Sequence, residues 1–307
     1  MTNTVKAVAL GLILSFATSA VTGQERTAPP CKHTVTGELQ VFRFDSKIFG
    51  NTRMLRVWLP PGYADVANQS KRYPVLYMFD GQDLFDACTG PDAKYEWQVD
   101  ETMTRLIAEG KVEPMIVVGI DHAGERRLIE YVPWRDFMTP EMPEPEGRRM
   151  PDFMLHEVLP VIEAKYRIAK GAENTGIGGS SAGAVAAVYV AQQAPLRFGR
   201  LLAESVVPWF GNGQLVRDSA NIGIAPERVW FGVGGKEAHY PGWHMTDAMQ
   251  KMIQQIASNF RAAPLRPSEV KYVVDPDGGH NVEAWAKRFP DAVLFLFGHP
   301  PPSSTSQ

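Results

Sequence analysis

The sequence predicts an α/β fold, with a mostly parallel, doubly wound sheet that carries helices on both faces. Short apolar runs typical of buried strands alternate along the chain with longer amphipathic segments of helical spacing. The alternation extends over most of the 307 residues, without an internal repeat. This order is typical of a parallel sheet, because each crossover packs its helix back onto one face of the sheet.

The expected strands are short, and most are continuously apolar. Residues 39–44 and 53–59 alternate apolar and polar side chains, which predicts a hairpin with one face toward solvent. Residues 73–79 and 115–120 are apolar runs typical of strands that are buried on both faces. The remaining expected strands are the run before Ser181, a strand after the helix that follows it, 229–233 and 270–274.

The expected helices lie between these strands and carry apolar residues at helical spacing. They cover 99–109, 152–166, 182–193, 245–261 and 282–297. Gly110 ends the first of them. Pro160 and Pro290 fall inside two others, and because proline lacks a backbone donor, the ends of those two helices are left open.

Both chain ends are expected to lie outside the folded domain. Lys6 is followed by an apolar run over 7–17 and then by small residues, which predicts a secretory signal peptide over 1–23. The run is too short for a transmembrane helix, so we expect no stable membrane anchor. Residues 299–307 are rich in proline and serine and are expected to form a disordered tail, which leaves 24–298 as the catalytic domain.

Charge and cysteine content exclude several classes of partner. Removal of residues 1–23 takes away Lys6 and no acid, so the mature net charge is 30 − 34 = −4. This mild acidity, without a basic block, argues against nucleic acid or an anionic membrane surface as partner. The two cysteines, Cys31 and Cys88, are too few for a metal cluster. In an exported protein they could form one disulfide, with two separate thiols as the alternative.

Residues 179–183 have the pattern G-x-S-x-G between an expected strand and an expected helix. This is the context of a nucleophile elbow, where a sharp strand-to-helix turn projects a serine hydroxyl above the sheet. The pattern places Ser181 at the nucleophile position and Ser180 beside it. A serine nucleophile also needs a base, an acid that orients the base, and donors for the oxyanion.

His280 is the expected base, because it closes the loop 275–280 directly after the strand 270–274. That position overhangs the carboxyl edge of a parallel sheet. Glu237 is the expected acid, because it follows the strand 229–233 by one turn. The chain order of serine, acid and histidine is that of α/β-hydrolases. The alternatives are His239 and His244 for the base, and Asp247, Asp275 and Asp277 for the acid.

The expected oxyanion donors are the backbone N–H groups of Gln82 and Ala182. Ala182 follows the nucleophile at a helix N-terminus, and Gln82 lies in the loop after the strand 73–79. A simple tight turn at Asp80 and Gly81 is the alternative for that loop.

Two further sets of residues have other expected roles. Trp209, Tyr240 and Trp243 are candidates for the substrate pocket, with ordinary packing as the alternative. Arg127 and Glu130 lie three residues apart and are expected to form a structural ion pair.

In these segments the chain resembles the putative-esterase family of α/β-hydrolases. That family includes enterochelin-type siderophore esterases, feruloyl and acetyl-xylan esterases and S-formylglutathione hydrolases. The resemblance runs from residue 39 to residue 297 and rests on 56–63, 73–77, 80–86, 116–121, 127–131, the elbow, and 278–280 with Trp285. It implies an α/β-hydrolase fold, a triad of Ser181, Glu237 and His280, and oxyanion donors at Gln82 and Ala182. Relatives often have Met-Gly-Gly after the nucleophile, where this chain has Ala-Gly-Ala.

The residues and the resemblance together predict an exported serine esterase, periplasmic or secreted, that works through an acyl-enzyme. Its substrate would be a small-molecule or carbohydrate ester, such as an acylated carbohydrate, a siderophore lactone or a small acyl ester. An acyltransferase with the same triad is the nearest alternative, and a non-catalytic binding protein is the other. No cofactor or metal is expected, because the chain lacks a complete dinucleotide fingerprint and an HExxH motif. The oligomeric state is left open.

Overall fold

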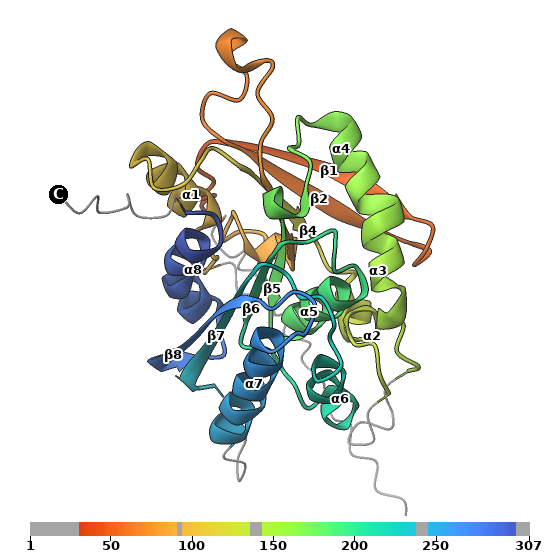
Figure 1. The fold of residues 1–307 in the computed structure, drawn as a ribbon. Helices are drawn as coiled ribbons and strands as arrows, with labels where there is room; N and C mark the ends of the chain where they lie inside the picture. The colour runs from red at the N-terminus through yellow and green to blue at the C-terminus, as the bar shows by residue number, and fades with distance from the viewer. Residues whose placement is uncertain (1–30, 91–93, 136–142, 238–244, 299–307) are drawn as a thin grey trace, which may run out of the picture. The chain divides into compact units, whose positions relative to one another are not determined.

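An eight-stranded sheet forms the centre of the domain in the computed structural model, which describes residues 31–90, 94–135, 143–237 and 245–298 (Figure 1). In chain order the strands are β1 (Glu38–Ser46), β2 (Asn51–Leu59), β3 (Val75–Phe79), β4 (Ile116–Ile120), β5 (Thr175–Ser180), β6 (Arg200–Glu204), β7 (Arg228–Lys236) and β8 (Glu269–Gly279). Across the sheet their order is β1-β2-β4-β3-β5-β6-β7-β8. The expected signal peptide, 1–23, and the expected tail, 299–307, lie outside the described residues.

The sheet is mostly parallel, as predicted. β1 and β2 form an antiparallel hairpin, and β2 is also antiparallel to β4. Every neighbouring pair from β4 to β8 is parallel. The carboxyl ends of these strands therefore meet at one edge, where the loops that follow them lie together.

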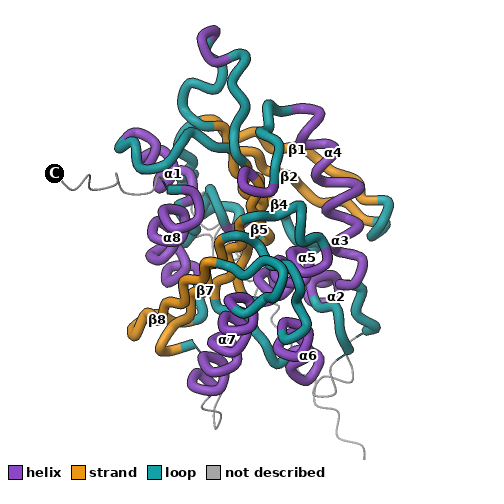
Figure 2. The backbone as a smooth tube through the Cα atoms, viewed as in Figure 1, coloured by secondary structure: helices purple, strands orange, loops and turns teal. Residues whose placement is uncertain are grey.

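Helices cover both faces of the sheet (Figure 2). They are α1 (Val99–Ala108), α2 (Arg127–Tyr131), α3 (Met150–Asp152), α4 (Leu159–Lys165), α5 (Ala182–Gln193), α6 (Phe210–Ser219), α7 (Met245–Arg261) and α8 (Val282–Phe297). α1 and α8 pack on one face, and α3 to α7 pack on the other. The predicted helices on both faces are confirmed.

Each face of the sheet has its own apolar core. Under α1 and α8, the Trp97 ring lies 5.8 Å from that of Trp285 and 5.9 Å from that of Phe289, measured between centroids. On the opposite face, nine of the twelve residues of α5 are buried, and most of these are alanine or valine. Because these side chains are small, α5 lies close against the strands. This packing fixes the N-terminus of α5 at the end of β5.

The segment 152–166 departs from the single helix that its spacing predicts. It contains α3, a π-helical stretch over Phe153–Val158, and α4. Pro160 is the second residue of α4 and lies inside a run that is helical without a break from Met150 to Lys165. α8 likewise continues through Pro290. The sequence does not predict α6, because the Gly-Asn-Gly run over 211–213 breaks the helical pattern, and in the structure these three residues have positive φ.

A disulfide joins Cys31 to Cys88 across 57 positions of sequence. It ties the first described residues to the loop that follows β3. Both cysteines are used in this bond, and the described chain holds no free thiol. Among the described residues, no helix is both long enough and apolar enough to cross a membrane.

Candidate active site

Ser181 lies at the turn between β5 and α5, with φ 55° and ψ −126°. Non-glycine residues rarely adopt a positive φ, and this strained conformation is typical of a nucleophile elbow. Glycines make the turn possible, because a Cβ at Gly179 would lie 2.8 Å from the carbonyl carbon of Gly183. Ser181 is partly exposed, whereas Ser180 is buried at the end of β5. The turn therefore exposes Ser181 rather than its neighbour.

His280 lies between Ser181 and Glu237. Its Nε2 is 2.8 Å from Ser181 Oγ, and its Nδ1 is 2.7 Å from Glu237 Oε2. The parallel pairing of β7 and β8 accounts for this approach, because Lys236 pairs with Gly279 and the next residues are Glu237 and His280. An imidazole placed this way can donate Nδ1–H to the carboxylate and accept the serine proton at Nε2.

The Glu237 carboxylate is fully buried, while the side chain of His280 is 29% exposed. Glu237 Oε1 accepts hydrogen bonds from Ser205 Oγ at 2.6 Å and from the backbone N–H of Gly234. Burial alone would raise the pKa of Glu237, but hydrogen bonds from His280, Ser205 and Gly234 outweigh it and hold the pKa below its ordinary value. Glu237 is therefore ionised at neutral pH and can orient the imidazole.

Ser205 is a member of the site that the sequence analysis does not identify. It directly follows β6 and has φ 47°. Its hydroxyl donates to Glu237 and accepts a hydrogen bond from Trp285 Nε1 at 2.8 Å. The Trp285 ring also packs edge-on against His280, with centroids 5.4 Å apart. The sequence marks Ser205 only by its position after an expected strand, β6, which lies next to β5, the strand that leads into Ser181.

A buried ion pair between Arg288 and Glu204 lies next to the site. Arg288 on α8 contacts the Glu204 carboxylate at 2.7 Å, and both side chains are almost fully buried. The backbone carbonyl of Glu204 accepts a hydrogen bond from Ser181 N at 2.9 Å. Gly232 on β7 leaves room for this carboxylate, because a Cβ there would lie 2.2 Å from Glu204 Oε1. Ser181 and Ser205 are thus both anchored to the end of β6.

The expected oxyanion donors are Ala182, at the N-terminus of α5, and Gln82, in the turn that follows β3. Ala182 is the first residue of α5, so its N–H has no acceptor within the helix. Gln82 lies in the 3-10 turn Gly81–Asp83 after β3, the parallel neighbour of β5. A Cβ at Gly183 would lie 2.7 Å from Asp80 Oδ2. Gly183, next to Ala182, therefore packs closely against Asp80, the residue that precedes the turn with Gln82.

The predicted ion pair between Arg127 and Glu130 is wrong. Arg127 instead makes two hydrogen bonds of 2.7 Å to the carboxylate of Asp80, directly before the turn that carries Gln82. Glu130 pairs with Arg53 at 2.6 Å, and both side chains are fully buried. Burial of the ionised Glu130 carboxylate is costly unless a partner compensates its charge, and Arg53 supplies that charge. Arg53 belongs to β2, far from Glu130 in sequence, so helical spacing gives no information about it.

Two of the competing acids, Asp275 and Asp277, pair with lysines. Asp275 contacts Lys287 at 3.1 Å, and Asp277 contacts Lys236 at 2.8 Å. Asp247 lies in the first turn of α7. Trp209 is half-buried and packs against the core on the α5 face. The other pocket candidates, Tyr240 and Trp243, and the alternative bases, His239 and His244, lie outside the described residues.

In the described part of the chain, one group of side chains has the composition of a metal site, namely His33, Asp86 and Cys88. The sulfur of Cys88 is bonded to Cys31, so it cannot act as a thiolate ligand. His33 Nδ1 lies 2.6 Å from the Asp86 carboxylate, which a hydrogen bond explains.

Comparison with known proteins identifies the family of the chain. The sequence model of the family described as "Putative esterase" matches residues 46–296. The uncharacterized protein YbbA of Bacillus subtilis (strain 168) is 21% identical over 259 residues, which cover 81% of this chain and 94% of that protein.

Solved structures share the fold. A ferulic acid esterase superposes with a TM-score of 0.62 at 21% identity, covering 85% of this chain and 98% of its own. The enterobactin esterase of Shigella flexneri superposes with a TM-score of 0.63 at 18% identity, covering 87% of this chain and 61% of its own.

Proposed function

This chain belongs to the putative esterase family and is a carboxylic ester hydrolase, and we propose that it is a serine esterase with Ser181 as nucleophile, His280 as base and Glu237 as acid. One observation carries the proposal: a single imidazole lies 2.8 Å from the serine hydroxyl and 2.7 Å from a buried carboxylate. A serine hydroxyl is a weak nucleophile at neutral pH and needs such a base. A protein that only binds a ligand does not need a serine, a histidine and a carboxylate in this arrangement. The arrangement therefore favours catalysis over a non-catalytic binding role.

In the first half of the reaction, Ser181 Oγ attacks the ester carbonyl carbon while His280 Nε2 takes its proton. Ionised Glu237 stabilises the resulting imidazolium through Nδ1–H. The N–H groups of Gln82 and Ala182 would donate to the carbonyl oxygen as it becomes an oxyanion. Collapse of the tetrahedral intermediate breaks the ester C–O bond, and His280 gives its proton to the departing alcohol.

In the second half, water attacks the acyl-enzyme carbonyl and His280 takes a proton from that water. The second tetrahedral intermediate expels Ser181 Oγ, which recovers its proton from His280 as the carboxylic acid leaves. A sugar hydroxyl in place of water would make the same site an acyltransferase. The arrangement of Ser181, His280 and Glu237 serves either acceptor.

We place the enzyme in the periplasm or outside the cell. The apolar run over 7–17 behind Lys6 supports export through a signal peptide over 1–23. The Cys31–Cys88 disulfide supports an oxidising compartment. The substrate would be an acylated carbohydrate, a siderophore lactone or a small acyl ester, and the solved relatives named for ferulic acid and enterobactin guide this choice.

Hydrolysis of p-nitrophenyl acetate by the protein, by Ser181→Ala and by Ser180→Ala tests the nucleophile. Loss of Ser181 should lower kcat by about 10⁴-fold or more, as for other catalytic serines. Ser180→Ala is the matched control, because it removes the neighbouring buried hydroxyl, and it should retain most of the activity. Equal activity of Ser181→Ala and the unmodified protein would overturn the proposal.

Substrate and acceptor need a separate measurement. A panel of feruloyl, acetyl and catecholate esters would rank the three substrate classes by kcat/KM. Product analysis with a sugar acceptor present would separate hydrolysis from acyl transfer, because transfer yields an acylated sugar instead of free acid.

A further inference from the structure

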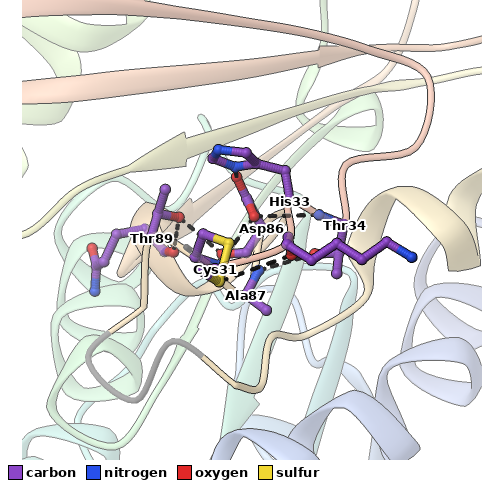
Figure 3. Close-up of a disulfide and its surroundings, with 9 residues drawn as sticks. Cys31, His33, Thr34, Asp86, Ala87 and Thr89 are labelled. Atoms are coloured by element: carbon purple, nitrogen blue, oxygen red, sulfur yellow. Dashed lines mark hydrogen bonds and ion pairs between the residues drawn. A yellow bond between two sulfur atoms is a disulfide. The ribbon is translucent and has the colours of Figure 1, made fainter. Parts of the chain in front are cut away.

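The hydroxyl of Thr89 holds the loop that carries Gln82. Thr89 Oγ1 lies 2.6 Å from the backbone carbonyl oxygen of Gln82 and 3.0 Å from that of Asp86 (Figure 3). The Asp86 carbonyl already accepts a hydrogen bond from Thr89 N at 3.0 Å. A hydroxyl has one proton to donate, and the shorter contact assigns it to the Gln82 carbonyl.

The rest of Gln82 is also held. Its side-chain Oε1 accepts from the backbone N–H of His122 at 3.3 Å, and its Nε2 donates to Asp83 Oδ2 at 3.1 Å. The preceding Gly81 packs against the backbone of β4, where a Cβ would lie 2.6 Å from Ile120 N. With carbonyl, side chain and preceding residue all held, the direction of the Gln82 N–H has little freedom.

Thr89 is itself anchored through the neighbouring residue Cys88. The disulfide bonds Cys88 to Cys31, at the start of the described chain. Next to this bond, Thr34 Oγ1 accepts from Ala87 N at 3.0 Å. The segment 31–34 is thus joined to the loop by one covalent bond and by hydrogen bonds beside it (Figure 3).

The buried carboxylate of Asp86 completes the anchor. It accepts from Cys88 N at 3.0 Å and from Thr34 N at 3.4 Å, and it lies 2.6 Å from His33 Nδ1. These contacts gather the disulfide, the segment 31–34 and the turn that ends at Thr89 around one side chain.

We propose that Thr89 is a positioning residue for the oxyanion donor Gln82, and that the Cys31–Cys88 disulfide holds Thr89 in place. This inference rests on the proposed function, in which the Gln82 N–H stabilises the oxyanion. Such donors act because they are fixed before the reaction begins. If the loop that carries the donor becomes mobile, kcat should therefore fall more than substrate affinity does.

Three variants test the role of the hydroxyl. Thr89→Val removes the donor and keeps the shape, and Thr89→Ser keeps the donor. Thr175→Val is the matched control, because Thr175 also donates its hydroxyl to a backbone carbonyl, that of Gly171 at 3.0 Å, but at the start of β5. Measurements are made on p-nitrophenyl acetate, well below the thermal unfolding midpoint of each variant.

Thr89→Val should lower kcat by about 10- to 100-fold, which is less than outright loss of an oxyanion donor costs. KM should stay within about twofold, because ground-state binding does not use the oxyanion site. Thr89→Ser should restore most of kcat, and Thr175→Val should leave kcat unchanged. The proposal is overturned if Thr89→Val matches Thr175→Val, or if Thr89→Ser is as slow as Thr89→Val.

The double variant Cys31→Ser with Cys88→Ser tests the anchor and also serves if Thr89→Val does not fold. It should lower kcat with little change in KM, in protein that is still folded at the assay temperature. Combined with Thr89→Val, its effect on kcat should be less than additive, because both changes release the same loop. Unchanged kcat or full additivity would contradict a role for the disulfide in positioning Thr89.

Failure of the proposed function would look different. In that case the unmodified protein would have no activity that depends on Ser181, whereas failure of the present inference leaves that activity intact and insensitive to Thr89.

Discussion

Ser205 donates a 2.6 Å hydrogen bond to Oε1 of Glu237, the carboxylate whose Oε2 lies 2.7 Å from His280 Nδ1. The two oxygens of one buried acid are therefore shared between a fixed hydroxyl and the imidazole. Trp285 donates to the same hydroxyl at 2.8 Å, which leaves the proton of Ser205 free to point at Glu237. The orientation of His280 depends in this way on a residue from the neighbouring strand.

Replacement of Ser205 by alanine should lower kcat on the order of 10-fold, because a hydrogen bond to a charged group contributes about 1.5–3 kcal/mol. It should also raise the pKa of Glu237, since one of the hydrogen bonds that lower this pKa is lost. When folding lowers the pKa of a carboxyl group, its ionised form stabilises the folded state at pH values above the pKa of the unfolded chain. This stabilisation is lost as the pH falls through the pKa of the folded state. The acid loss of activity and stability should therefore begin at a higher pH in Ser205→Ala.

The measurement for Ser205→Ala is kcat on p-nitrophenyl acetate across the acid range, together with thermal unfolding. Ser219→Ala is the control, because Ser219 is also fully buried and donates to the Val216 carbonyl at 2.7 Å, but on α6. If Ser205→Ala keeps kcat within twofold and has an unshifted acid limb, Ser205 has no part in holding Glu237.

Gly183 should not tolerate a methyl group. A Cβ there would lie 2.7 Å from Asp80 Oδ2, and Arg127 holds that carboxylate through two hydrogen bonds. Gly183→Ala should therefore displace either the start of α5 or the turn with Gln82. We expect a loss of about 1–3 kcal/mol in the free energy of unfolding, typical of overpacking, and a lower kcat.

Gly223→Ala is the matched control for this steric prediction, because its Cβ would meet Leu265 Cδ1 at 3.7 Å, an ordinary contact. Urea unfolding and ester hydrolysis are measured for both variants. The steric argument fails if the two alanine variants have the same stability and the same kcat.

The sequence alone predicts those parts of the site that depend on short segments of chain. Ser181, Glu237 and His280 each follow a recognisable strand, and parallel pairing then brings the ends of those strands to one edge of the sheet. Contacts between distant segments leave no such trace. Arg127 pairs with Asp80, which lies 47 positions earlier in the sequence. Ser205 lies beside Glu237 because β6 and β7 are neighbours in the sheet. The expected pair of Arg127 with Glu130 fails because Arg53 from β2 takes the buried carboxylate.

Asp100 on α1 should make the stability of the protein fall as the pH rises. Its side chain is fully buried, Oδ2 accepts from Thr36 N, and Oδ1 has no hydrogen-bond partner. Burial raises its pKa to about 8, and Glu101 beside it raises the pKa further, while the hydrogen bond from Thr36 lowers it. Burial likewise raises the pKa of Glu96 to about 7 and that of Asp83 to about 7.

The sign follows from proton binding. Between the unfolded pKa of about 4 and these raised values, the folded protein holds protons that the unfolded chain has released. The free energy of unfolding should therefore decrease with pH over this window, with a slope of up to about 1.4 kcal/mol per pH unit for each group.

Asp100→Asn is neutral at every pH and keeps an acceptor for Thr36 N, so it should make the fall of stability with pH less steep and be relatively more stable at the alkaline end. Glu109→Gln is the control at the exposed end of α1, where the pKa of Glu109 lies below its ordinary value because of Lys111. Thermal unfolding midpoints are measured from acid to alkaline pH. If the midpoint declines equally steeply in Asp100→Asn and in the unmodified protein, the Asp100 carboxyl is not the source of the decline.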